Sequence, residues 1–444
     1  MMERKFKITP INILYAMLMV ILPVICVGGV SVYPAKLKFP GIIATGIICL
    51  LLTLYVKKKI VLDTITVPML FLSGYILISA SYSLDPELSM NLFVIYISSV
   101  MLLFADLPET IIDKIIFIFK IFAIVIAVSI ILSVFIDDFI LKFFSFIVNP
   151  KNSADLNYSI RSEIKYSKAY SGLSTERSDA AYIMNVGISL IFADYFSGKK
   201  LKPKDFGLLI LFVIALVFTN KRTLFLIPVI TFSVLMLLGN VKSKLVKYVA
   251  VVMVAVVGFI TLAAFIPEMS NIYNRFVLSD SHDVLNGRGE LWHYSTEMFA
   301  KNPIFGFGFG SFNEYAFNQG LRIRGGRWDY YGHNCYYELA GELGIVGVIL
   351  FLLAFVLPFV YTFAMIKRNC CTQNQNKLLM FSLYVQIMFL IYSMSGNVIY
   401  YTQQIAMWFF AIAITAGVRR QNSFRFSWKF GQKLNRHTVS GGII

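Results

Sequence analysis

Three short motifs carry the residues best suited to chemistry, and each lies next to hydrophobic segments. "TNKRT" contains Lys221 and Arg222, "NGRGELW" contains Arg288, and "GHNCYYELAGELG" contains His333. A guanidinium offers a planar fork of N–H donors that fits phosphate oxygens, and an imidazole can accept the proton of an attacking hydroxyl. Together the motifs would bind a phosphate or diphosphate and activate a hydroxyl beside it.

Each motif also has a purely structural explanation. Lys221 and Arg222 could extend to lipid headgroups, Arg288 could be an ordinary loop arginine, and a single histidine often serves only as a hydrogen-bonding residue. Cations at a helix boundary outside the cytoplasm are costly without an anion, which favours a functional role for Arg222 and leaves Lys221 open. The glycines around Arg288 permit close backbone approach to a ligand, and a helix starting there would add its positive dipole end.

Other polar residues near these motifs could support a site. Glu338 and Glu342 follow His333 and are one helical turn apart. They could orient the histidine or cap a hydrogen-bond network, or they could be ordinary solvated residues at a helix end. Further candidates for supporting contacts are Asn334, Arg177 and Arg275.

The glycine-rich segment "NPIFGFGFGSF" is not a nucleotide-binding loop. It lacks the GK[ST] ending and the preceding strand that such a loop requires. Its alternation of Phe and Gly predicts a flexible apolar turn that dips into the membrane interface.

The composition defines the elements that must position these residues. The chain has 444 residues, of which 58% are hydrophobic and 14% charged, and a mean hydropathy of +0.72. This excludes a soluble globular domain and indicates a polytopic membrane protein. Apolar runs of roughly 17 to 25 residues recur along the chain, and they must be helices because backbone groups in lipid have to be satisfied within each segment.

The hydrophobic pattern predicts an all-α protein with about twelve spans and both termini on one side. The predicted spans are Ile11–Ser31, Pro40–Val56, Thr66–Tyr82, Leu88–Ala105, Ile115–Ile136, Asp179–Phe196, Phe206–Thr219, Thr223–Leu238, Val246–Ile266, Leu343–Ile366, Leu378–Met394 and Thr402–Gly417.

Basic residues cluster in every second short loop, which places those loops and both termini in the cytoplasm. The predicted divisions are nine spans in 1–266 with a shorter outer loop at 137–177, a large extracytoplasmic loop at 267–334, three spans in 335–418 and a basic cytoplasmic tail at 419–444. Lys120 is the one charged residue well inside a predicted span, within reach of its cytoplasmic end.

The net charge of +16 is explained by basic residues facing anionic lipid on the cytoplasmic side, so a nucleic-acid partner is not expected. Of the five cysteines, Cys335 alone is predicted near the outer face. We therefore expect no internal disulfide there, and no residue spacing indicates a metal site.

The order of "TNKRT", "NGRGELW", "NPIFGFGFGSF" and "HNCYYELAGELGIVGVILF" over Thr219 to Phe351 resembles the O-antigen ligase and O-antigen polymerase superfamily. The resemblance implies a GT-C-like, metal-independent, inverting glycosyltransferase of the bacterial cytoplasmic (inner) membrane, which needs no cofactor and has its active site facing the periplasm. It implies an undecaprenyl-diphosphate-linked glycan donor bound by Arg222 and Arg288, and a catalytic His333. The implied partners are a glycan or lipid A core acceptor, membrane lipids and a chain-length regulator.

Two members of the superfamily and two other classes of protein stay open. "NGRGELW" favours a repeat-unit polymerase over a ligase, which would use the same donor. A transporter would also have about twelve spans, but such proteins usually show two related halves and ionisable residues near the midplane, and neither is evident here. A flippase or scaffold in the same pathway would make His333 dispensable.

Overall fold

The computed structural model describes residues 9–27, 34–136, 138–143, 164, 168–174, 176–238, 288–321 and 331–424, and these residues form helices and no strand. The predicted ninth span, Arg275 and most of the tail lie outside these ranges. The helices are α1 (Pro10–Val27), α2 (Pro34–Leu52), α3 (Thr66–Ser79), α4 (Pro86–Val100), α5 (Glu109–Phe135), α6 (Phe139–Phe143), α8 (Arg177–Phe196), α9 (Pro203–Phe218), α10 (Arg222–Leu238), α13 (Arg288–Lys301), α14 (Phe312–Asn318), α15 (Cys335–Arg368), α16 (Gln373–Ser393) and α17 (Thr402–Gln421).

The chain is a polytopic membrane protein. Among the described residues, six helical segments are long and apolar enough to cross a membrane, and α3 and α10 are shorter apolar helices. The six are Pro10–Val27, Lys38–Val56, Pro86–Leu103, Glu109–Phe135, Cys335–Arg368 and Gln373–Ser393. Every predicted span except the ninth overlaps a described helix. The total of twelve stays a prediction.

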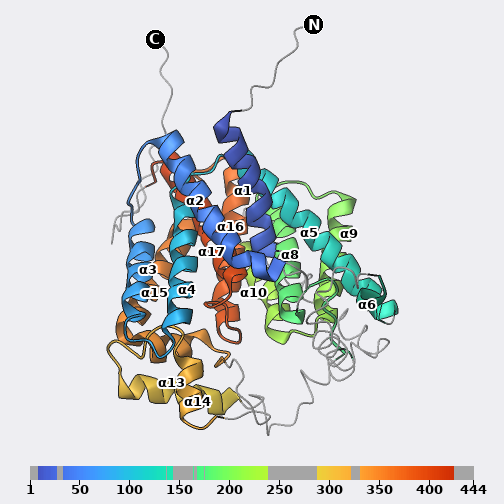
Figure 1. The fold of residues 1–444 in the computed structure, drawn as a ribbon. Helices are drawn as coiled ribbons and strands as arrows, with labels where there is room; N and C mark the ends of the chain where they lie inside the picture. The colour runs from blue at the N-terminus through green and yellow to red at the C-terminus, as the bar shows by residue number, and fades with distance from the viewer. Residues whose placement is uncertain are drawn as a thin grey trace.

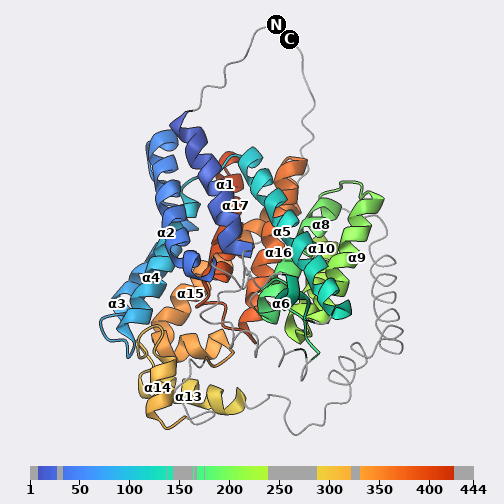
Figure 2. The same ribbon diagram turned by 45° about the vertical axis from the view of Figure 1, so that its right-hand side comes forward.

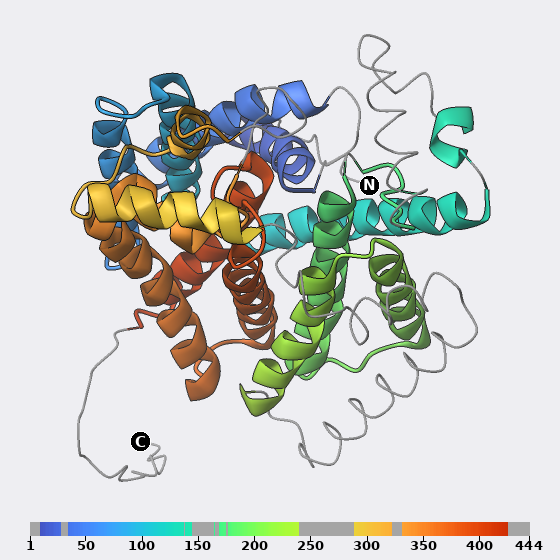
Figure 3. The ribbon, with the colours of Figure 1, turned by 90° about the horizontal axis from the view of Figure 1, so that it is seen from below.

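The helices form a bundle with two distinct ends (Figures 1 and 2). Helices α13 and α14 lie at one end, which we call the outer end because the charge pattern predicts that it is extracytoplasmic. Helix α1 begins and α17 ends at the opposite, inner end. Viewed from the outer end, α13 lies across α15, and the two helices are in contact (Figure 3).

Charged residues predicted to be cytoplasmic pair with one another at the inner end. The guanidinium of Arg420 binds the carboxylates of Asp63 and Asp106. Lys120 does not stand alone within its span, because its ammonium lies 3.6 Å from the carboxylate of Asp205 at the start of α9. These pairs lower the cost of charged groups near the lipid boundary.

Helices α16 and α17 occupy the interior of the bundle. Both are buried along most of their length, as expected of helices that are apolar around their whole circumference. The ring of Trp408 stacks on Phe389 at 4.5 Å and on Phe355 at 5.5 Å. This aromatic core fixes α15, α16 and α17 relative to one another.

A kink at Gly344 divides α15 near its start. Gly344 has φ 59° and ψ −166°, outside helical geometry, and a side chain there would clash with the carbonyl of Ile304. The kink frees backbone groups that pair with the glycine-rich segment: the N–H of Gly308 donates to Glu342 O at 2.8 Å, and the N–H of Ile345 donates to Pro303 O at 2.9 Å. Backbone hydrogen bonding therefore anchors this segment to α15.

The glycine-rich segment only partly matches the expected apolar turn. The side chains of Ile304 and Phe305 are 54% and 53% exposed, as residues that enter a membrane interface would be, but Phe309 is fully buried. Gly306, Gly308 and Gly310 all have positive φ, so the alternating glycines permit a fixed turn against α15.

Candidate active site at the outer end

Four basic residues from three separate motifs come together at the outer end. Burial lowers the pKa of His333 to about 4, and the nearby charges of Arg288 and Lys221 act in the same direction. Burial also lowers the pKa of Arg288; Tyr392 opposes this shift and the charge of Arg222 adds to it. We call Lys221, Arg222, Arg288 and His333 the cation cluster. Their mutual repulsion makes the cluster a receptive place for an anion.

Arg222 is positioned by a tight turn between α9 and α10. Asn220 in this turn has φ 52°, and the hydroxyl of Ser395 donates to Thr223 Oγ1 at 2.8 Å. The amide of Asn185 on α8 donates to Leu224 O at 3.0 Å, and Tyr384 OH donates to the same amide's oxygen at 2.8 Å. The start of α10 is thus tied to α8, to α16 and to the turn that follows α16.

Arg288 is the first residue of α13, and Trp292 docks this helix on α15. The indole Nε1–H donates to Gly332 O at 2.9 Å, and the indole ring stacks on Tyr337 at 5.4 Å. Gly341 allows the close approach of the two helices, because a side chain there would press on Ser295 and Met298. The "NGRGELW" motif therefore places Arg288 beside the turn that carries His333.

His333 lies in a strained turn immediately before α15. Its φ of 53° is uncommon for a residue with a side chain. The buried carboxylate of Glu338 accepts the backbone N–H groups of Gly332 and His333, and Asn334 caps α15 by accepting the N–H of Tyr336 at 3.1 Å. Glu338 and Asn334 thus hold the backbone that presents the imidazole.

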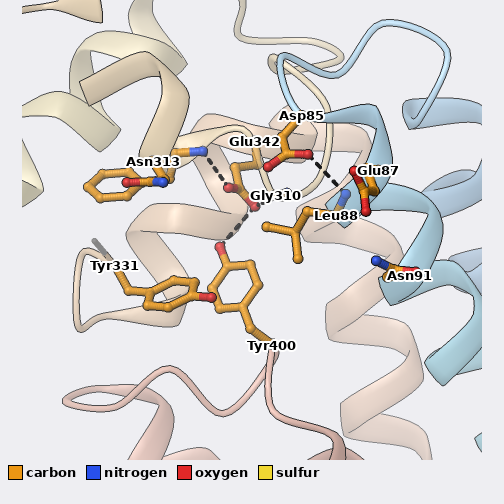
Figure 4. Close-up of a pocket in the computed structure, with 10 residues that line it drawn as sticks. Asp85, Glu87, Leu88, Asn91, Gly310, Asn313, Tyr331, Glu342 and Tyr400 are labelled. Atoms are coloured by element: carbon orange, nitrogen blue, oxygen red, sulfur yellow. Dashed lines mark hydrogen bonds between the residues drawn. The ribbon is translucent and has the colours of Figure 1, made fainter. Parts of the chain in front are cut away.

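Glu342 organises a second hydrogen-bond network, and like Glu338 it is fully buried. Its carboxylate accepts the N–H of Gly310 at 2.9 Å, the N–H of Phe312 at 2.8 Å and Tyr400 OH at 2.9 Å (Figure 4). Of the interpretations drawn from sequence, holding the histidine turn describes Glu338, capping a hydrogen-bond network describes Glu342, and helix-end solvation describes neither.

A family model described as O-antigen ligase matches residues 207–352. This segment of the chain is therefore similar to the O-antigen ligase family. The match runs from α9 into α15 and so includes the whole cation cluster together with Glu338 and Glu342. It confirms the resemblance to the O-antigen ligase and polymerase superfamily. No curated protein matches the chain.

Arg177 and Arg275 are the two remaining candidates for supporting contacts. Arg177 is the first residue of α8, and its neighbours Glu176 and Ser178 interact with Tyr392, which also interacts with Arg288. The start of α8 therefore lies close to the cation cluster. Arg275 is outside the described residues, and its role stays a prediction.

One cluster of polar side chains close to Tyr392 was not anticipated from sequence. Lys38 Nζ donates to Gln403 Oε1 at 3.0 Å, and Gln403 Nε2 donates to Asp179 Oδ1 at 2.5 Å. Asp179 and Tyr392 interact as well, which connects this group to Arg288. The only sequence signal was polar residues at the ends of three distant spans, and nothing in that pattern pairs them.

We expect Glu342→Gln to destabilise the segment of residues 207–352. Glutamine has one acceptor oxygen and directs an NH₂ donor at the N–H of Gly310 or Phe312, so a buried N–H loses its partner. The cost should be roughly 1–3 kcal/mol, measured as a lower thermal midpoint of the purified protein in detergent. Glu290→Gln on the exposed surface of α13 is the matched control; equal midpoints for both variants would contradict the proposed role of Glu342.

We expect Trp292→Phe to lower activity while leaving the fold intact. Phenylalanine keeps a ring to stack on Tyr337 but removes the N–H that holds Gly332 O, so the His333 turn gains freedom. Misplacement of a reacting group lowers a catalysed rate by roughly ten- to a hundredfold, measured as the activity of the purified protein. Tyr337→Leu keeps the hydrogen bond and weakens the stack, and a greater loss in that variant would show that stacking is what matters.

Proposed function

We propose that this chain is a membrane glycosyltransferase that transfers an undecaprenyl-diphosphate-linked glycan to a sugar hydroxyl at the outer face of the cytoplasmic membrane. The observation that carries the proposal is the convergence of Arg222 and Arg288 beside His333 at the outer end of the bundle. An anion-receptive cluster next to a neutral imidazole suits a donor with a diphosphate leaving group and an acceptor hydroxyl.

The proposed mechanism is a single displacement. Arg222 and Arg288 bind the diphosphate and stabilise the negative charge that develops on it as the glycosidic bond breaks. His333 Nδ1 or Nε2 accepts the proton of the acceptor hydroxyl, whose oxygen attacks the anomeric carbon from the face opposite the diphosphate. The anomeric configuration is inverted, and undecaprenyl diphosphate leaves. The activated donor supplies the free energy, so the proposed reaction needs no metal, nucleotide or other cofactor.

Within this class we favour a polymerase of surface-glycan repeat units, because of the form of "NGRGELW". The second candidate is a ligase that joins the glycan to lipid A core, and the O-antigen ligase match supports it. The same match disfavours a transporter or flippase. We also propose that the acceptor is glycan or lipid core, and that a chain-length regulator acts with the enzyme.

The deciding experiment is a glycan profile of a strain that lacks this gene. Surface glycan is resolved on a gel, and the polyprenyl-linked pool is extracted and sized. A single repeat unit on the core means that a polymerase is missing, whereas a bare core with long polymer left on the lipid carrier means that a ligase is missing. A profile identical to the parent strain would refute both.

A further inference from the structure

A pocket of about 270 Å³ lies at the outer end, and none of its lining residues belongs to the cation cluster. Its walls come from the start of α4, the end of the glycine-rich segment with the first residues of α14, Glu342 of α15, and two tyrosines that precede α15 and α17 (Figure 4). Its polar and aromatic lining includes Asp85, Glu87, Asn91, Asn313, Tyr331 and Tyr400. We call it the acidic pocket.

The lining chemistry suits a sugar and opposes a phosphate. Carboxylate and amide groups such as those of Glu87, Asn91 and Asn313 exchange hydrogen bonds with hydroxyls. No Lys, Arg or His is among the described residues that line the pocket, so a phosphate or carboxylate there would face Asp85 and Glu87 without a counter-charge. A ligand rich in hydroxyls and free of negative charge fits instead.

The aromatic wall of the pocket is rigid. The ring of Tyr331 packs on Tyr400 at 4.9 Å, and Tyr400 stacks on Phe309 at 5.4 Å. Tyr400 is fixed further by its hydrogen bond to Glu342. Asp85 caps α4 by accepting the N–H of Leu88 at 3.0 Å through Oδ1, which orients its carboxylate at the pocket edge. A pocket with fixed walls loses little entropy when a ligand binds.

The acidic pocket and the proposed base are connected by consecutive residues of the chain. Tyr331 lines the pocket, Gly332 is held by Trp292 and Glu338, and His333 follows. A sugar bound against Tyr331 therefore lies beside the turn that presents the imidazole, while a diphosphate would be bound on the other part of the site by the cation cluster.

We propose that the acidic pocket binds one sugar of the acceptor glycan, a neutral or amino sugar without carboxylate or phosphate. The pocket volume lies near the lower end of the roughly 300–1,000 Å³ typical of small-molecule sites, which suits a single ring better than a long oligosaccharide. The assignment rests on the proposed transferase function and divides the site: cations for the donor diphosphate, carboxylates and aromatic rings for the acceptor.

The test is a binding titration with full-length protein in lipid nanodiscs. The ligand is the repeat-unit oligosaccharide released by mild acid from the host strain's polyprenyl-linked pool. The double variant Glu87→Gln/Asn91→Ala should raise Kd at least about tenfold through the loss of two hydrogen bonds. Glu290→Gln should leave Kd unchanged, and so should added inorganic diphosphate, which is expected at the cation cluster.

Three results would overturn the assignment: no binding by the wild type, an unchanged Kd in a double variant with the wild-type thermal midpoint, or competition by diphosphate. Failure of the pocket assignment can be distinguished from failure of the proposed transferase function. Normal surface glycan in the deletion strain, with oligosaccharide binding lost in the double variant, would refute the transferase and retain a sugar-binding pocket. Altered glycan without oligosaccharide binding would refute the pocket alone.

Discussion

Replacement of His333 by alanine should lower the transfer rate by roughly 10²–10⁴-fold, the usual contribution of a general base. The acceptor hydroxyl is a poor nucleophile until its proton is removed, and His333 is the residue of the cation cluster that can accept a proton at neutral pH. The rate is measured with purified protein and lipid-linked donor. His293→Ala is the matched control, because His293 is exposed on α13. Full activity of His333→Ala would refute the catalytic assignment.

The pH dependence of the wild-type enzyme tests the same residue independently. Burial, with the charges of Arg288 and Lys221, lowers the pKa of His333 to about 4, so the unliganded enzyme holds the neutral, proton-accepting form throughout pH 5–8. Activity should be lost only as the pH falls through the pKa. A bound diphosphate would offset the two cations and raise the pKa, so the acid limb of kcat should lie at higher pH than that of kcat/KM.

A variant that removes one of these charges should move the profile in a defined direction. Arg288→Ala removes a cation that lowers the pKa of His333, so the acid limb of kcat/KM should shift to higher pH. His293→Ala should leave the limb in place. Coincident limbs in the wild type and in Arg288→Ala would mean that the titrating group is not His333.

The membrane helices could be predicted from sequence because lipid allows few alternatives. Backbone groups in hydrocarbon must be satisfied within each segment, so apolar length alone indicated where α1, α5 and α16 lie. The shape of the first part of α15 was harder to predict from sequence. "GELGIVG" is compatible with an unbroken helix, and the kink at Gly344 exists because the glycine-rich segment supplies the hydrogen bonds that the helix gives up there.

In the candidate site, too, residues could be selected from local sequence, but their contacts with distant segments could not be predicted. Arg222, Arg288 and His333 could be selected because cations and an imidazole are unusual at the boundaries of apolar helices. The partners of Glu342 could not be found, because its contacts depend on how the glycine-rich segment and the turn before α17 pack on α15. Those of Glu338 depend on the turn at His333, which the sequence did not predict. Lys38 and Asp179 were missed for a related reason: they meet only through Gln403, from three helices far apart in the chain.

Arginine at positions 222 and 288 should be required for its shape as well as its charge. Alanine at either position should reduce kcat/KM by about 10²–10³-fold, the typical effect of losing one group that stabilises a developing oxyanion. Lysine keeps the charge but cannot make two parallel N–H···O bonds to one phosphate, so each lysine variant should recover only part of this loss. The same lipid-linked donor assay measures it, with Lys301→Ala, at the far end of α13, as the control.

The double variant decides whether the two arginines act on one anion. If Arg222 and Arg288 bind the same diphosphate, the second alanine should cost far less than the first, because the leaving group is already poorly held; separate roles would give additive losses. Arg288 also affects the pKa of His333, so the comparison belongs at a pH where the imidazole is neutral in every variant. Near-full activity of Arg222→Lys would refute a bidentate contact there, and additive losses in the double variant would place the two guanidiniums on different parts of the substrate.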